Sequence, residues 1–73
     1  MKPSNSLFYK LSDENRNKIL TKLSESNLTF SELIEKTGIA NTGTLNYHIR
    51  ILGDLILKNE EGKYMLTEKG RLA

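Results

Sequence analysis

Residues 42–52 combine apolar side chains at helical spacing with polar side chains that can form hydrogen bonds. Leu45, Ile49 and Leu52 recur at intervals of four and three, which predicts the buried face of an amphipathic helix. The opposite side and its flanks would carry a small residue, a phenol, a guanidinium, a hydroxyl and an amide: Gly43, Tyr47, Arg50, Thr44 and Asn46. Such groups can bond base edges and phosphates in a DNA major groove, although every exposed helix face is polar. No Asp or Glu occurs in residues 37–52, which strengthens the nucleic-acid interpretation.

Other residues could add phosphate contacts at the margins of such a surface. Gly43 lies near the helix start, where a missing side chain would let a phosphate approach the helix N-terminus. Lys58 and Lys63 flank a polar turn and could contact phosphates beside the groove, although two glutamates at the tip weaken that interpretation. Arg16 lies on an earlier helix and is either a phosphate contact or a structural arginine.

His48 is the only histidine, and it falls at the margin of the apolar face of residues 42–52. The chain has no cysteine, and no second metal ligand lies nearby. No serine or acid is spaced as an obvious catalytic partner. We therefore expect no catalytic residue, no metal site and no cofactor, and a protein that is not an enzyme. The expected role of His48 is a hydrogen bond that holds its helix to the scaffold, with a phosphate contact as the alternative.

Two helical segments are predicted before the turn that precedes residues 42–52. Residues 7–11 form a short helical pattern that Ser6 can cap, and Ser12 opens a longer helix with acidic residues in its first turn. The apolar residues of this longer helix are Ile19, Leu20 and Leu23, and it should end within residues 24–27.

The next helix is short and has recognisable signals at both ends. Thr29 and Glu32 form a capping box, and Gly38 supplies a left-handed stop after about two turns. Its expected buried residues are Phe30, Leu33 and Ile34. Asn41 or Thr42 can cap the following helix, and Gly53 ends it. The two helices are therefore separated by a tight turn.

After Gly53 the periodicity changes from helical to extended. Residues 55–58 and 63–66 are short aliphatic or alternating runs separated by a polar turn with Gly62, which predicts a β-hairpin. Residues 67–69 begin one more helix. The predicted fold class is α+β, mainly α: a winged helix-turn-helix with a three-helix core, a two-stranded wing and the start of a C-terminal helix. The recognition helix is about 42–52 and the wing about 55–67.

The 73 residues allow one small domain, predicted over 7–73, after a flexible tail at 1–6. Eleven basic residues against nine acidic ones give a net charge of +2, which permits nucleic-acid binding without arguing for it. No apolar run is long enough to span a bilayer, and the start lacks the apolar stretch of a signal peptide. The expected location is the cytoplasm, away from a membrane.

Four segments of the chain, in register, resemble the ArsR-like winged-helix transcriptional regulators. Residues 11–20 match their L-S-D-x-x-R-x-x-I-L opening, and residues 30–33 with 37–39 look like their second helix and turn. Residues 44–49 with Leu52 are similar to their recognition helix. Residues 64–70 look like the wing strand and helix start of a short archaeal branch.

The resemblance implies sequence-specific binding of double-stranded DNA and control of transcription. It carries base-reading roles onto a small set of residues: Thr42, Thr44, Asn46, Tyr47 and Arg50. It also implies a homodimer that reads two half-sites about one helical turn apart. Pairing would use Leu7, Phe8, Leu11 and the C-terminal helix that begins at residue 67. Metal sensing is not implied, because the chain lacks the cysteines and the clustered ligands of the metal-sensing members.

A second class of function is open to the same fold. A winged helix can serve as a protein-protein interaction module without binding DNA. The nearly balanced charge and the acidic tip of the predicted wing favour this alternative.

Overall fold

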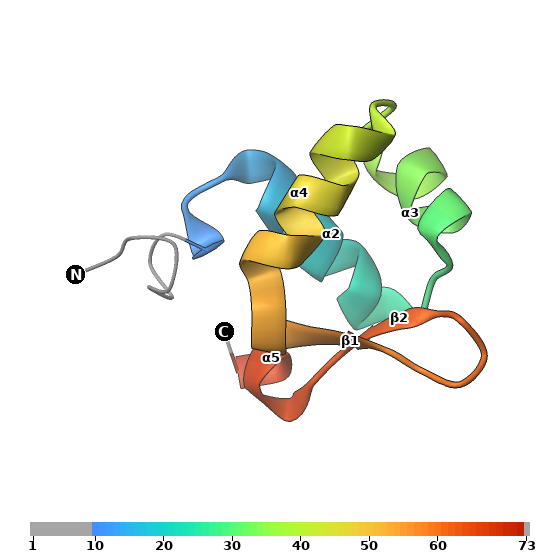
Figure 1. Cartoon of the computed structure of the whole chain (residues 1–73). Coiled ribbons are helices and arrows are strands. Elements are labelled where there is room, and N and C mark those ends of the chain that lie inside the picture. Colours follow the sequence, from blue (N-terminus) through green and yellow to red (C-terminus); the bar gives the residue numbers. More distant parts are fainter. Residues whose placement is uncertain (1–9, 73) are drawn as a thin grey trace.

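The computed structural model describes residues 10–72. Three helices are followed by a hairpin and a short last helix (Figure 1). The elements in chain order are α2 (Glu14–Glu25), α3 (Phe30–Thr37), α4 (Thr42–Leu52), the 3-10 turn η2 (Gly53–Leu55), β1 (Ile56–Lys58), β2 (Tyr64–Leu66) and α5 (Glu68–Leu72). The predicted α+β class, mainly helical with a C-terminal hairpin, is confirmed. The predicted tail at 1–6 and most of the helical pattern at 7–11 lie outside the described residues.

The helix ends follow the predicted capping signals, with one correction. The N-cap of α2 is Asp13 and not Ser12, because the Asp13 carboxylate accepts hydrogen bonds from the backbone N–H groups of Asn15 and Arg16. The capping box of α3 is complete: Thr29 Oγ1 accepts from the Glu32 N–H, and Glu32 accepts from the Thr29 N–H. The capped helices therefore begin and end at defined residues.

A tight turn joins α3 to α4. Gly38 has a φ of 76° and closes α3 in the left-handed conformation, which a side chain would disfavour. Ile39 is buried directly after it and packs into the core. The Asn41 side chain then caps α4 by accepting from the Thr44 N–H at 3.0 Å. The turn therefore fixes the relative orientation of two consecutive helices.

The hairpin pairs β1 with β2 in antiparallel register, with Ile56 opposite Leu66. The expected strand at 55–58 is one residue too long, because Leu55 lies in the 3-10 turn η2. Residue 63 likewise precedes β2. Leu28, between α2 and α3, forms an isolated antiparallel bridge with Tyr64 through two backbone hydrogen bonds. This bridge ties the hairpin to the helices and was not predicted.

The last helix, α5, is held against the turn after α4. Thr67 Oγ1 donates to the Asp54 carbonyl and accepts from the Gly70 N–H. The Asp54 carboxylate binds both Lys10 and Lys69, at 3.2 and 2.9 Å. A Cβ at Gly70 would collide with the backbone carbonyl of Leu55, so only glycine allows this close approach.

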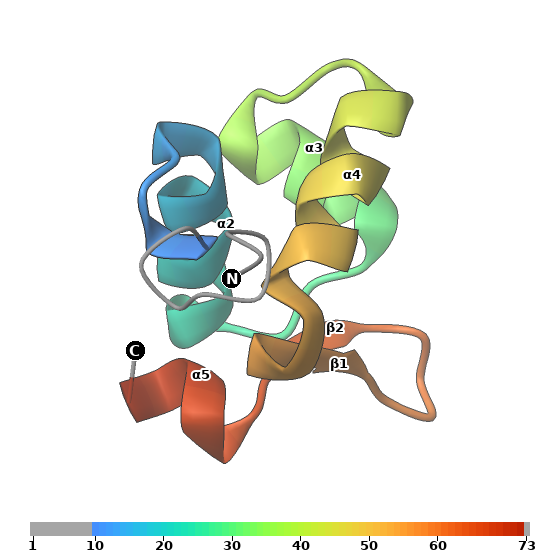
Figure 2. The ribbon, with the colours of Figure 1, turned by 60° about the vertical axis from the view of Figure 1, so that its left-hand side comes forward.

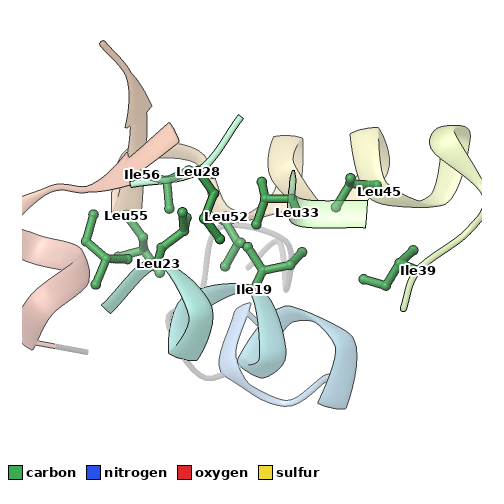
Figure 3. Packing of buried hydrophobic residues seen from close by; sticks show 10 residues of the cluster. Ile19, Leu23, Leu28, Leu33, Ile39, Leu45, Leu52, Leu55 and Ile56 are labelled. Atoms are coloured by element: carbon green, nitrogen blue, oxygen red, sulfur yellow. The ribbon is translucent and has the colours of Figure 1, made fainter. Parts of the chain in front are cut away.

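One apolar core joins α2, α3, α4, the 3-10 turn and the hairpin (Figure 3). Its buried members are Ile19, Leu23, Leu28, Leu33, Ile39, Leu45, Leu52, Leu55, Ile56 and Leu66. The predicted core residues Leu20, Phe30, Ile34 and Ile49 are only half-buried and pack against its edge. Within residues 10–72, no helix is both long and apolar enough to cross a membrane.

Candidate nucleic-acid interface

The helix α4 lies on the outside of the three-helix arrangement, with one side uncovered by other elements (Figures 1 and 2). Its inner side is fixed by three buried residues, Leu45, His48 and Leu52. Its outer side exposes hydroxyl, amide, phenol and guanidinium groups: Thr42, Asn46, Tyr47 and Arg50. Tyr47 is 49% exposed, although its ring also meets the His48 imidazole edge-on at 5.4 Å between centroids. The predicted division of this helix into two faces is confirmed for Leu45 and Leu52, whereas His48 is buried and Ile49, expected in the buried face, is only half-buried.

Two predicted site residues near the start of α4 are placed differently from the rest. Thr44 is half-buried at the flank of the exposed face. Gly43 is exposed, and a Cβ at this position would lie only 3.1 Å from the Asn41 side-chain oxygen. Glycine therefore leaves room for the Asn41 N-cap, and the phosphate contact of Gly43 stays a prediction.

A buried polar network fixes the angle of α4 on α2. His48 is 5% exposed, and its Nδ1 lies 3.1 Å from Nη1 of Arg16. Since the guanidinium can only donate, Nδ1 must accept, so the proton of the neutral ring is on Nε2. Nε2 faces the Asp13 carboxylate at 4.0 Å. The predicted hydrogen bond that holds His48 to the scaffold is confirmed, with His48 as the acceptor and Arg16 as the donor.

The same network determines the charge of the imidazole. Burial lowers the pKa of His48, the neighbouring Asp13 carboxylate raises it, and the Arg16 guanidinium lowers it further, with a net lowering. Burial raises the pKa of Asp13, but the Asn15 and Arg16 backbone N–H groups and the charges of His48 and Arg16 outweigh it, with a net lowering. His48 is therefore neutral in the folded protein at pH 7.

We expect the free energy of unfolding to fall on mild acidification because of His48. Its pKa is about 6.5 when unfolded and lower when folded, so the unfolded chain binds the proton first. The stabilisation is complete above about pH 6.5 and is lost as the pH falls toward the folded pKa. Urea unfolding at several pH values between about 7.5 and 5 measures how steeply the free energy of unfolding changes with pH. Asp13 does not interfere in this window, because its pKa lies below the ordinary value of 3.8.

The control for this titration is His48→Asn, whose amide oxygen can accept from Arg16 but cannot titrate. We expect the variant to be less stable overall, with a nearly flat pH dependence across the same window. The chain contains no other histidine. If the unfolding free energy of the variant still fell with pH as in the wild type, His48 would not be the cause of that fall.

The predicted phosphate role of Arg16 is wrong. Arg16 is 4% exposed, its Nε donates to the Lys10 carbonyl at 3.0 Å, and its Nη1 donates to His48. A guanidinium enclosed in this way cannot reach a phosphate outside the protein. The structural alternative that the sequence left open is therefore the correct one.

The two hairpin lysines occupy different surroundings. Lys58 is exposed, and its Nζ lies 5.7 Å from the centroid of the Tyr64 ring. Lys63 is half-buried near the start of α3. The hydrogen bond that Glu32 accepts from the Thr29 backbone N–H is the main cause of its lowered pKa. The positive charge of Lys63 adds to that lowering. Their phosphate contacts stay a prediction.

The sequence interpretation missed a second polar surface on the helices. Lys18 and Lys22, one helical turn apart on α2, lie with Lys36 of α3 around a groove. The i, i+4 spacing was visible in the sequence, but only the fold brings the lysine of α3 to them. Among residues 10–72, no group of three or more His, Asp or Glu side chains could hold a metal ion.

Two consecutive helices joined by a tight turn, a third helix beneath them and a hairpin directly afterwards define a winged helix-turn-helix protein. Residues 4–73 match the model of a family described as a domain of unknown function, DUF7347, and the chain belongs to that family. No match is found among curated proteins or among solved structures. Because the family description assigns no activity, function has to be argued from the surfaces of the fold.

Proposed function

We propose that the protein is a sequence-specific regulator of transcription that binds double-stranded DNA, with α4 in the major groove and the hairpin beside the backbone. The observation that carries this proposal is the exposed face of α4. It presents hydrogen-bonding groups without an acidic residue, on the second helix of a helix-turn-helix, and its opposite face is anchored in the core.

The side chains of this face suit distinct tasks on a duplex. Arg50 can donate two hydrogen bonds to one guanine, and Asn46 can bond an adenine edge. Tyr47 offers both an apolar ring and a hydroxyl. Thr42 and Gly43 lie at the helix start, where backbone N–H groups can meet a phosphate. Good base contacts of this kind discriminate by about 1–3 kcal/mol each.

Several general features are compatible with this role. The resemblance to ArsR-like regulators favours a homodimer that reads two half-sites, and the cytoplasmic location expected from the sequence is compatible with this role. Of the residues expected to pair, Leu7 and Phe8 lie outside the described residues. Leu11 is half-buried in a groove that Leu20 and Leu66 also line, and Leu72 of α5 is 82% exposed. In the proposed dimer, Leu11 and Leu72 would contact the second copy.

The test is binding to labelled mixed-sequence duplex DNA, followed by fluorescence anisotropy at about 50 and 200 mM salt. We expect affinity that weakens steeply with salt, and a loss of at least about tenfold in the double variant Tyr47→Ala with Arg50→Ala. Lys22→Ala is the control, because it removes the same charge from α2, at a position away from α4 and from the proposed pairing surface. Circular dichroism must first show that both variants are folded.

The competing function is a winged-helix interaction module without DNA binding. It predicts equally weak binding by the wild type and the double variant, and no affinity above that of an unrelated protein of matched charge. That result would overturn the DNA proposal, and the exposed face of α4 would then be a candidate surface for a protein.

A further inference from the structure

A groove of about 470 Å³ lies between α2 and α3 and is separate from the exposed face of α4. Its lining comes from α2 and α3 alone, without a residue of α4 or of the hairpin. Three lysines surround it, Lys18, Lys22 and Lys36, together with the single acidic residue Glu14. The groove therefore has as large a net positive charge as the whole chain.

The three groove lysines have no ion-pair partner among the described residues, in contrast to Lys10 and Lys69, which both bind Asp54. Lys36 only adds a weak lowering of the pKa of Glu32, after the hydrogen bond from the Thr29 backbone. Unpaired cations around one groove leave their charge available for an anionic partner.

Two of the other polar side chains of the groove, Thr37 and Asn17, are already engaged in hydrogen bonds within the chain. The Thr37 hydroxyl donates to the Leu33 carbonyl and accepts from the Ile39 N–H. The Asn17 amide nitrogen donates to the Leu11 carbonyl at 2.8 Å. No aromatic side chain lines the groove. A small ligand needs convergent hydrogen-bond donors and close enclosure, so this groove suits it poorly.

We propose that the α2–α3 groove binds an acidic segment of a partner protein. Lys18 and Lys22 are spaced by one helical turn, about 6 Å, and Lys36 faces them from the other helix, so several carboxylates along one segment could each meet an ammonium group. Charge complementarity carries the recognition, since three ammonium groups from two helices line the groove. Because α4 does not line the groove, the partner and DNA could be bound together.

The experiment titrates the full chain, isotopically labelled for NMR, with a synthetic decapeptide of glutamate at about 50 and 150 mM salt. We expect amide shifts concentrated in residues 14–22 and 36–37, with α4 unaffected. The triple variant Lys18→Gln, Lys22→Gln, Lys36→Gln should bind the peptide about tenfold more weakly. The matching triple arginine variant should retain the affinity, which separates the role of charge from loss of fold.

A charge-matched control removes three other cations: Lys58→Gln, Lys63→Gln and Arg71→Gln. It should weaken peptide binding less than about twofold. Equal weakening in both triple glutamine variants, or shifts spread over all lysines, would overturn the proposal in favour of nonspecific attraction. Tripolyphosphate bound at the same residues as tightly as the peptide would also overturn it, in favour of a small anion.

Duplex DNA is the last arm of the same experiment. Shifts caused by DNA at residues 14–22 that disappear with the groove variant would make the groove part of the DNA face and contradict a protein partner. The double variant Tyr47→Ala with Arg50→Ala keeps the groove intact. It should bind the glutamate peptide normally whether or not α4 binds DNA, so the two proposals can fail independently.

Discussion

Replacing Leu45 by alanine is expected to unfold the domain at ordinary working temperature. The Leu45 side chain is 0% exposed and lies in the core near Leu33 and Ile39 (Figure 3). Removing a fully buried leucine side chain costs about 2–5 kcal/mol, including the cavity that remains. A core of this size supplies only about 3–5 kcal/mol of net stability, so one such change consumes most of it.

Thermal and urea unfolding, followed by circular dichroism, measure this loss. Ile49→Ala is the graded comparison on the same helix: the sequence suggests the same effect, but Ile49 is half-buried at the edge of the core, so we expect a smaller loss. A wild-type melting curve for Leu45→Ala would show that α4 does not pack as described.

The helix boundaries were predictable because they depend on neighbours in sequence. The side chains of Thr29 and Glu32 each accept a hydrogen bond from the backbone N–H of the other, within four residues of sequence. Gly38 ends the helix because it adopts the left-handed conformation. The two faces of α4 follow from its period in the same way. The one wrong cap, Ser12, arose because two adjacent residues, Ser12 and Asp13, are both good N-caps.

The parts that the sequence could not predict depend on contacts between distant residues. Arg16 and His48 are 32 positions apart, and only the crossing of α2 and α4 places the guanidinium on the imidazole. The bridge from Leu28 to Tyr64 likewise joins the loop before α3 to the hairpin. Local patterns contain no information about such pairs, so the sequence could not decide between a structural role and a phosphate contact for Arg16.

This long-range network bears directly on the proposed function. A recognition helix must keep its angle so that exposed side chains meet base edges in register. The apolar contacts of Leu45 and Leu52 hold α4 in the core, but apolar contacts are non-directional and tolerate small rotations about the helix axis. Hydrogen bonds from Arg16 to both His48 and the Lys10 carbonyl have strict geometry, and therefore restrict that rotation.

Replacing Arg16 by lysine separates its structural role from a phosphate contact, because the charge is conserved. One ammonium cannot reproduce the two donors that meet the Lys10 carbonyl and His48 Nδ1. We expect a loss of about 1–3 kcal/mol for the acceptor left without a partner in the interior. Arg16→Met should lose more, since both acceptors are then left without a donor. Urea unfolding measures both losses.

A second measurement compares the salt dependence of DNA affinity in Arg16→Lys and Arg16→Met, at a temperature where both variants are folded. Since Arg16 is 4% exposed, we expect the dependence of log affinity on log salt to keep the wild-type slope in Arg16→Met as well. Loss of a true phosphate contact would reduce that slope by about 0.9. A reduced slope in Arg16→Met, with the wild-type slope kept in Arg16→Lys, would return Arg16 to the DNA surface and contradict the buried network.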